Sequence, residues 1–186
     1  MVGFHEGMHH HRRSIRLKGY DYSRAGVYFV TIVTWGRLML FGKIENGKMK
    51  LNRYGEIVQK WWDDIPSHFP NVETGAFVIM PNHVHGIIII VDRRGAVSAP
   101  HTEDASQQQG GGTPPLRKPT LGQIVAYFKY KSTKEINVMD GGRIAKLWQR
   151  NYYEHIIRNE REMENIWNYI ESNPAMWAKD EENPAK

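Results

Sequence analysis

The strongest constraint on the fold is an unbroken run of five β-branched residues, Ile87 to Val91, directly after the stretch His83-Val84-His85-Gly86. Such residues favour strands, and a run that is apolar on both faces is typical of a strand buried in the middle of a sheet. The run is much shorter than the roughly 18 residues that suggest a membrane-spanning helix. We therefore expect a protein without a membrane partner, built around this central strand.

The rest of the chain alternates predicted strands and helices over 186 residues, a length that suits one domain. Strands are predicted over 27–35, 74–80 and 83–92, a strand or extended segment over 148–158, and a small hairpin over 42–51. Apolar residues at helical spacing predict helices over 52–69, 120–137 and 159–172, with Asn52 and Asn159 as N-caps. This order favours an α+β sandwich with helices packed mainly on one face of the sheet.

Two segments have a different composition. Residues 93–119 are rich in Gln, Gly and Pro and cannot bury enough apolar surface to order themselves, which predicts a flexible insertion within the domain. The histidine-rich N-terminal stretch is expected to be a mobile tail. The chain contains no cysteine, which excludes disulfides and thiolate metal ligands, and no apolar stretch of signal-peptide length follows the N-terminus. A cytoplasmic protein is expected.

The positive charge is unevenly distributed along the chain. The formal net charge is +5, but residues 1–60 carry +7 and residues 117–161 carry +6, while the other two segments carry −4 each. Two basic stretches suggest a surface that attracts polyanions, of which nucleic acid is the commonest. Basic solvated faces also occur without a ligand, so charge alone only suggests a nucleic-acid partner.

His83 and His85 are two residues apart at the start of the central strand, so both side chains leave the same face. Neighbours of this kind lie about 6 to 7 Å apart, which lets two imidazoles share one metal ion. A His-x-His pair can also be an ordinary polar strand end. The break at Pro81-Asn82 and the lack of other polar residues in the strand favour the metal site.

The predicted last helix supplies a partner for this pair. Its apolar stripe consists of Met163, Ile166 and Ile170, and Tyr169 lies off that stripe. Asn173 follows Tyr169 by one turn, so the two side chains lie on one face. The plainer interpretation is a tyrosine at the edge of the core. The alternative is a functional tyrosine with an amide beside it.

Three motifs together resemble the REP-associated tyrosine transposases, which belong to the HUH (His–hydrophobic–His) superfamily of single-strand DNA transposases. The motifs are Pro81-Asn82-His83-Val84-His85-Gly86, Trp148-Gln149-Arg150-Asn151-Tyr152-Tyr153-Glu154-His155-Ile156-Ile157-Arg158, and Tyr169-Ile170-Glu171-Ser172-Asn173-Pro174. The resemblance spans roughly residues 15 to 178 without the insertion. Each motif alone is weak, but all of them in this order are specific.

The resemblance implies a ferredoxin-like fold with a central antiparallel sheet, and a divalent metal, Mg²⁺ or Mn²⁺, held by His83 and His85. It assigns the nucleophile to Tyr169 and a further ligand to Asn173, although Asn is shorter than the Gln found in some relatives. The implied reaction cleaves and rejoins single-stranded, hairpin-containing DNA through a 5′-phosphotyrosine link, which conserves the bond energy. A phenol of ordinary pKa near 10 needs help to react at neutral pH.

Further residues are candidates for contacts to DNA. Tyr152 and Tyr153 lie in a predicted strand, where only one can face the site, and Tyr127 and Tyr130 lie in the preceding helix. Aromatic residues interleaved with lysines suit a surface that stacks bases and binds phosphates. The basic residues singled out as nucleic-acid contacts are Lys129, Lys131, Lys134, Arg150 and Arg158.

The leading hypothesis is therefore a metal-dependent tyrosine DNA transposase or nuclease. An alternative is a protein of the same fold that binds structured nucleic acid without cutting it. A small metal-dependent hydrolase with another substrate would leave the basic segments unexplained. The resemblance to the REP-associated group favours a monomer over a homodimer.

Overall fold

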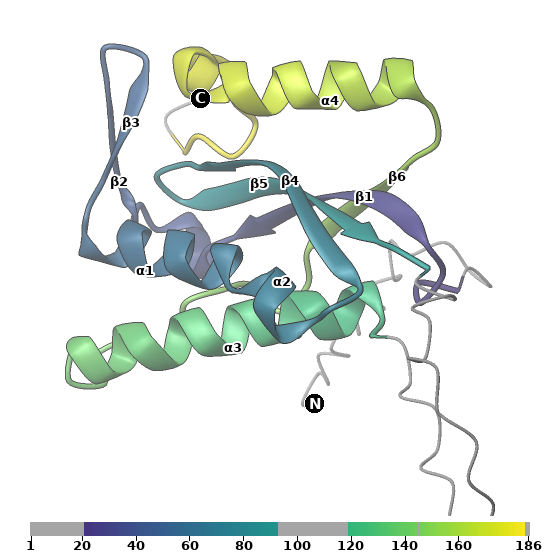
Figure 1. Ribbon diagram of the computed structural model, residues 1–186. Helices are drawn as coiled ribbons and strands as arrows, with labels where there is room; N and C mark the ends of the chain where they lie inside the picture. The colour runs from purple at the N-terminus through teal and green to yellow at the C-terminus, as the bar shows by residue number, and fades with distance from the viewer. Residues whose placement is uncertain (1–20, 93–118, 145, 185–186) are drawn as a thin grey trace, which may run out of the picture.

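A computed structural model describes residues 21–92, 119–144 and 146–184 (Figure 1). The expectations of a mobile N-terminal tail and of a flexible insertion concern residues outside this range, apart from the end of the insertion at residue 119. No helix in the described ranges is long and apolar enough to cross a membrane.

Four strands form the main sheet: β1 (Gly26–Val33), β4 (Val72–Ile79), β5 (His83–Ile90) and β6 (Tyr153–Ile157). Their order across the sheet is β4-β5-β1-β6, and every neighbouring pair is antiparallel. The helices α1 (Arg53–Asp63) and α3 (Leu121–Met139) complete the chain order β1-α1-β4-β5-α3-β6. This order and topology are the ferredoxin-like arrangement. The predicted α+β class and central antiparallel sheet are confirmed.

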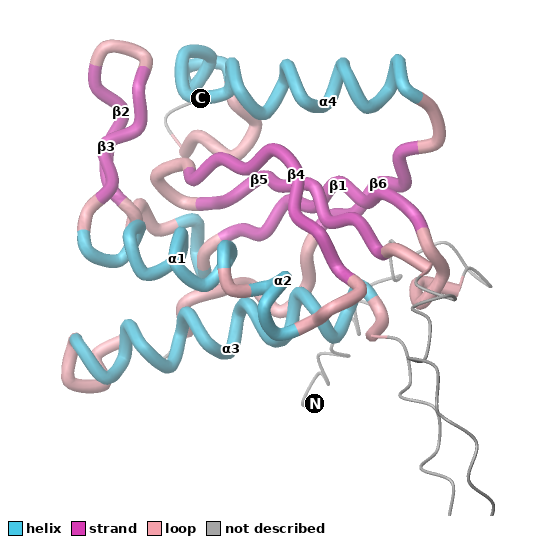
Figure 2. Tube along the Cα trace, in the orientation of Figure 1, coloured by secondary structure: helices cyan, strands magenta, loops and turns pink. Residues whose placement is uncertain are grey.

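Helices cover both faces of the sheet in unequal numbers (Figures 1 and 2). Helices α1, α3 and the short α2 (Ile65–His68) form a layer on one face, and α4 (Glu160–Ser172) lies on the other. Alternate residues of the central strands face the two layers, as expected for strands. Tyr28 and Ile88 pack in the core under α1 and α3, whereas Phe29 and Ile87 pack with Ile170 of α4.

Gly86 of β5 allows α1 to approach the sheet closely. A Cβ atom added at Gly86 would lie 2.3 Å from Cζ2 of Trp62 and 2.9 Å from Cδ2 of Phe77. Trp62 is buried, and its ring stacks on Phe77 with the centroids 4.2 Å apart. The glycine therefore lies under a packed pair of rings, on the face of β5 opposite to His85.

The predicted helix over 52–69 is divided in two. Helix α1 ends at Asp63 and α2 begins at Ile65, with Pro66 in the first turn of α2. Proline has no N–H to donate, and its ring would clash with the carbonyl of Trp62 one turn earlier in a continuous helix. The caps are as predicted: the Asn52 and Asn159 side chains accept hydrogen bonds from the first-turn amides of α1 and α4.

The segment 148–158, predicted as a strand or an extended segment, is a strand only in its second half. Only Tyr153–Ile157 pairs continuously with β1, and Trp148 forms an isolated bridge with Thr34. Between these pairings, three consecutive carbonyl oxygens of residues 149–151 accept hydrogen bonds from Nζ of Lys129 at 2.6–3.3 Å. Successive carbonyls of a regular strand alternate in direction, so this convergence is incompatible with a continuous strand.

The predicted hairpin is present as β2 (Gly42–Glu45) and β3 (Lys48–Leu51), which form a separate two-stranded sheet. Asn46 and Gly47 both have positive φ angles, as a two-residue hairpin turn requires. After α4 the chain continues in the 3-10 helix η2 (Asn173–Lys179). The segment after η2 folds back over the end of the sheet where β5 begins (Figure 1).

Candidate metal and tyrosine site

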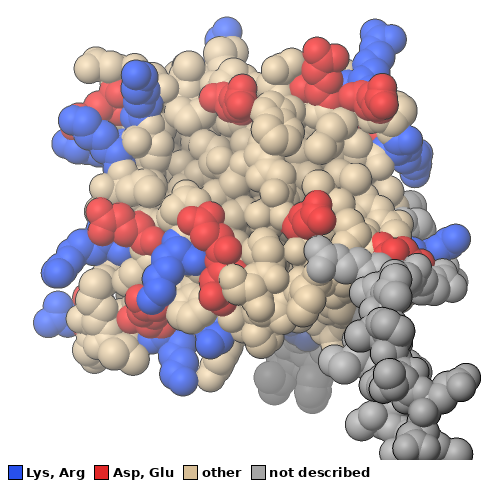
Figure 3. All heavy atoms as spheres, in the orientation of Figure 1, with Lys and Arg blue, Asp and Glu red and all other residues tan. Residues whose placement is uncertain are grey.

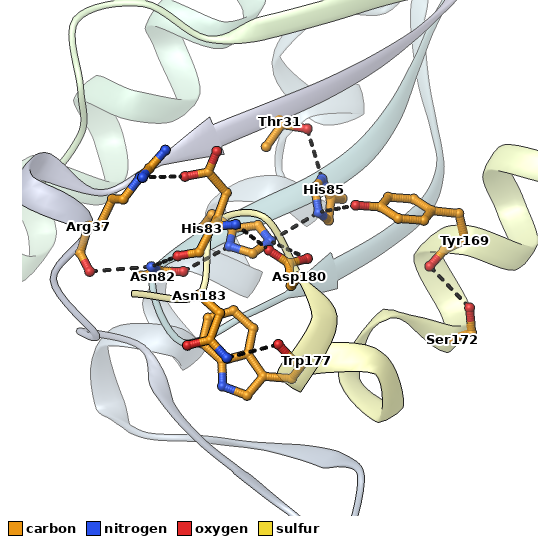
Figure 4. Close-up of polar contacts among 11 residues, drawn as sticks. Thr31, Arg37, Asn82, His83, His85, Tyr169, Ser172, Trp177, Asp180 and Asn183 are labelled. Atoms are coloured by element: carbon orange, nitrogen blue, oxygen red, sulfur yellow. Dashed lines mark hydrogen bonds and ion pairs between the residues drawn. The ribbon is translucent and has the colours of Figure 1, made fainter. Parts of the chain in front are cut away.

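His83 and His85 lie at the start of β5 and face the α4 side of the sheet (Figure 4). Both side chains are buried, and their Nε2 atoms are 3.0 Å apart. The prediction that a spacing of two would bring both rings to one face agrees with this arrangement. The pair therefore presents two nitrogen atoms at one point.

A polar partner contacts the other nitrogen of each ring. Nδ1 of His83 is 2.8 Å from Oδ1 of Asn82, and Nδ1 of His85 is 2.8 Å from Oγ1 of Thr31. Asn82 and Thr31 are themselves buried. The rings are thus held in place on both sides, as is usual for metal-binding histidines.

Tyr169 reaches this pair from α4. Its hydroxyl is 3.2 Å from Nε2 of His85, and its ring contacts Phe29 edge-on with the centroids 6.1 Å apart. The next residue, Ile170, is buried and anchors the helix on the sheet. Tyr169 itself remains 45% exposed. Its hydroxyl therefore lies beside the histidines while the side chain remains open to solvent.

The C-terminal segment brings a carboxylate to the histidines and a buried amide next to Tyr169. Asp180 lies directly after η2, and its Oδ2 is 3.9 Å from Nε2 of His83. One ligand atom each from His83, His85 and Asp180 lies within 4.8 Å of the others. Asn173 is buried, and its Oδ1 has no hydrogen-bond partner among the described residues. Buried nitrogen and oxygen donors with one unpaired carbonyl oxygen fit a divalent cation.

Asp180 was not among the predicted site residues. It begins the run Asp180-Glu181-Glu182, which in the sequence looks like a solvated acidic stretch. In the structure Glu182 forms an ion pair with Arg37 at 2.8 Å, and its backbone carbonyl accepts a hydrogen bond from Asn82. These contacts hold the segment against the sheet and bring the Asp180 carboxylate to the histidines.

The environment of the site sets the protonation of its members. Burial lowers the pKa of His83 to about 3, and burial together with the proximity of His83 lowers that of His85 to about 3. Both rings are therefore neutral at neutral pH, the state in which imidazole binds a metal. Burial and the Asp180 carboxylate raise the pKa of the Tyr169 phenol, and hydrogen bonding to Asn173 opposes the rise.

The other tyrosines are placed differently. Tyr153 lies on the same face as the histidines and contacts Phe29 edge-on at 6.3 Å, whereas Tyr152 lines a groove on the opposite face. This agrees with the expectation that only one of the pair can face the site. Tyr127 donates a hydrogen bond to Asp64 at 2.6 Å, and burial raises its pKa to about 12.

A groove of about 630 Å³ lies between α3 and residues 146–152. Lys134 and Arg150, two of the predicted contacts to nucleic acid, line it together with Lys146 and the exposed Tyr130. Lys129 also lines it, but its ammonium group is directed into the backbone of residues 149–151, and burial lowers its pKa to about 8. The groove combines cationic and aromatic side chains.

The two remaining predicted contacts lie elsewhere. Lys131 is outside the groove, with its Nζ 4.7 Å from the ring centroid of Trp61. Arg158 follows the end of β6 that pairs with Val27, so it lies far along the sheet from His85, which pairs with Thr31. On the face shown in Figure 3, acidic and basic side chains are interspersed over α1 and α3, without a continuous basic surface.

Comparison with known proteins places the chain among relatives. No protein-family model matches it. It is 44% identical over 173 residues to an uncharacterized protein of Haemophilus influenzae, covering 92% of this chain and 93% of that protein. It is 24% identical over 162 residues to a second protein of that organism, named "Putative REP-associated tyrosine transposase", covering 83% of this chain and 73% of the relative.

One solved structure shares the fold: a REP-associated tyrosine transposase bound to a REP hairpin, with a TM-score of 0.56. The two chains are 18% identical, and the match covers 88% of this chain and 74% of the other. At this identity the likeness concerns the fold. Together with the named relative, it agrees with the resemblance carried by the three sequence motifs.

Proposed function

Because the chain belongs to the family of the REP-associated tyrosine transposases, we propose that it cleaves and rejoins single-stranded DNA next to a hairpin, with Tyr169 as the nucleophile. The observation that carries the proposal is the position of the Tyr169 hydroxyl, 3.2 Å from Nε2 of His85, on a side chain that is half exposed. A nucleophile at this position would lie at the edge of the atoms proposed to hold the metal. The hairpin is taken from the relative of known structure, which is bound to one.

His83, His85 and Asp180 would hold a Mg²⁺ or Mn²⁺ ion, with Asn173 as a further ligand through its unpaired Oδ1. The chemistry that such an ion supplies is electrostatic, because positive charge next to a phosphate stabilises the negative charge of the transition state. With a cation bound, the Asp180 carboxylate would be neutralised and would no longer raise the pKa of Tyr169, which would favour the reactive form of the phenol.

In the proposed step, Oη of Tyr169 forms a bond to phosphorus while the bond from phosphorus to the 3′-oxygen breaks. The phenol loses its proton, and the departing 3′-oxygen gains one. The product is a 5′-phosphotyrosine link and a free 3′-hydroxyl, so the reverse attack by a 3′-hydroxyl rejoins a strand without an external energy source. Ile170 and Phe29 hold the tyrosine in position for attack.

The groove beside α3 is the proposed surface for the hairpin. Lys134, Lys146 and Arg150 supply positive charge for the phosphate backbone, and Tyr130 offers an exposed aromatic ring. Gln149, which also lines the groove, donates a hydrogen bond to the backbone carbonyl of Thr34, directly after β1. The groove thus runs toward the end of the sheet that carries His83. Tyr169 reaches the histidines of its own chain, which supports a monomer as the working unit.

The test is the formation of a covalent adduct. The full chain is incubated with Mn²⁺ and labelled DNA that carries a hairpin and a single-stranded flank, and the products are separated on a denaturing protein gel. We expect a labelled adduct with wild type and with Tyr153→Phe, and none with Tyr169→Phe or with EDTA. If wild type gives no adduct with any hairpin DNA but still binds it, the alternative of a binding protein without catalysis is correct.

A further inference from the structure

Two buried residues next to the histidines have no role in the proposed reaction so far. A neutral imidazole carries its proton on one nitrogen, and only the other nitrogen has a lone pair for a metal. We propose that Asn82 and Thr31 are positioning residues that set the tautomers of His83 and His85. Asn82 keeps His83 permanently ready to bind a metal, and Thr31 allows His85 to change between two tautomers. This inference rests on the proposed metal site.

The orientation of the Asn82 amide is settled by its surroundings. Nδ2 lies 2.7 Å from the carbonyl oxygen of Glu182 and 3.3 Å from that of Arg37, and a carbonyl oxygen can only accept. The amide nitrogen must therefore be on that side, and Oδ1 must face Nδ1 of His83 at 2.8 Å. An amide oxygen also only accepts, so Nδ1 of His83 carries the proton. The lone pair of His83 is then on Nε2, inside the site.

The tautomer of His85 follows from that of His83. The two Nε2 atoms are 3.0 Å apart, and since that of His83 has the lone pair, a hydrogen bond between them needs the proton on His85. Nδ1 of His85 then accepts from the hydroxyl of Thr31 at 2.8 Å, and the Tyr169 oxygen, 3.2 Å from Nε2, accepts from the same N–H. Without a metal, all three hydrogen bonds run in one direction, from Thr31 through both rings to Asn82 (Figure 4).

Metal binding would reverse the hydrogen bond between Thr31 and His85. For both rings to hold one ion through Nε2, the proton of His85 would have to move from Nε2 to Nδ1, with no net change in charge. Thr31 would then accept where it previously donated. A hydroxyl that rotates can do both, whereas a carbonyl or an amide N–H could do only one. Thr31 is therefore suited to a ring that changes its tautomer, and Asn82 to a ring that keeps it.

Two substitutions separate this role from simple packing. Thr31→Val keeps the shape but removes the hydroxyl, and Thr31→Ser keeps the hydroxyl but removes a methyl group. Loss of such a supporting hydrogen bond typically weakens metal binding about 10- to 100-fold. We expect that loss of Mn²⁺ affinity in Thr31→Val, and an affinity within about threefold of wild type in Thr31→Ser. A purely structural role would give the opposite order, because serine leaves the larger gap.

The direct test is NMR of the full chain with ¹⁵N-labelled histidine, because protonated and unprotonated ring nitrogens have well-separated shifts. His83→Gln and His85→Gln variants assign the signals. We expect His83 protonated on Nδ1 and His85 on Nε2 in the metal-free protein, and both on Nδ1 after addition of diamagnetic Zn²⁺. Thermal unfolding of each Thr31 variant checks that it is folded.

The outcomes distinguish this inference from the proposed function. His83 protonated on Nε2 in the metal-free protein would overturn the inference whether or not a metal binds. Unchanged Mn²⁺ affinity in a folded Thr31→Val would overturn the role of Thr31. Failure of wild type to bind Mn²⁺ or Zn²⁺ would contradict the proposed metal site instead, while the metal-free spectrum would still decide the tautomers.

Discussion

Gly86 is the position where the smallest change should have the largest effect on the fold. In Gly86→Ala the new Cβ would lie 2.3 Å from Cζ2 and 2.4 Å from Cη2 of Trp62. Real Cβ atoms do not approach other atoms so closely, so either the indole or strand β5 must shift. Trp62 cannot move easily, because it is 1% exposed and stacks on Phe77 with an interplanar angle of 8°.

The magnitude follows from the overlap. Overpacking of a well-filled core commonly destabilises by about 1–3 kcal/mol, and contacts this short on a ring that is held on its other side favour the upper end. We expect a loss of about 3 kcal/mol in the free energy of unfolding. For a domain of this size that lowers the midpoint of thermal unfolding by roughly 6–12 °C. Because Gly86 follows His85, the shift of β5 should also weaken Mn²⁺ binding.

Chemical and thermal unfolding of wild type, Gly86→Ala, Trp62→Phe and the double variant test this reasoning. Phenylalanine lacks the outer indole ring that contains Cζ2 and Cη2, so it removes the atoms that the new methyl group would meet. Gly86→Ala should therefore destabilise the Trp62→Phe background by less than half as much as wild type. Strictly additive effects of the two substitutions would refute the proposed clash.

Three further predictions concern elements that support the site. Ser132→Ala should destabilise by about 1–3 kcal/mol in urea unfolding, because the buried N–H of Trp148 donates to Ser132 at 3.0 Å and would lose its acceptor; an unchanged stability would exclude that bond. Asn159→Ala should lower stability by about 1 kcal/mol in thermal melts, since Asn159 caps α4, and the loss should disappear in Asn159→Ser. The third is a pH dependence. A hydrogen bond from the Arg158 backbone amide and, to a smaller extent, one from His155 lower the pKa of Glu162 from its ordinary value of 4.5. Its stabilising effect is present above pH 4.5 and is lost as pH falls through the lowered pKa, so the stability difference between wild type and Glu162→Gln should shrink on acidification and not on alkalinisation.

The order of the elements could be predicted because the spacing of apolar residues reports which side of an element is buried. The run after His85 predicted the central strand, and the 3- and 4-residue spacing of Met163, Ile166 and Ile170 predicted α4 and the position of Tyr169 off its apolar stripe. The same alternation placed His83 and His85 on one face. These features depend on near neighbours in sequence.

The parts that were missed depend on contacts between distant segments. Lys129 draws in the carbonyls of residues 149–151, so that β6 begins only at Tyr153, and nothing in the pattern of the segment 148–158 shows this. Asp180 reaches the site only because the C-terminal segment turns back over β5. Thr31 had a weak indication, as a hydroxyl inside an apolar strand, but its partner His85 becomes evident only from the register of β1 and β5.

The most direct measurement for the central claim is to locate the DNA on the protein by mass spectrometry. After reaction with Mn²⁺ and hairpin DNA, the chain is digested with nuclease and trypsin. The tryptic peptide 162–179 contains Tyr169 as its sole tyrosine, and peptide 151–158 contains Tyr152 and Tyr153. The account predicts a phosphonucleotide on peptide 162–179 and on no other peptide. A phosphonucleotide on peptide 151–158 instead would contradict the assignment of Tyr169 as the nucleophile.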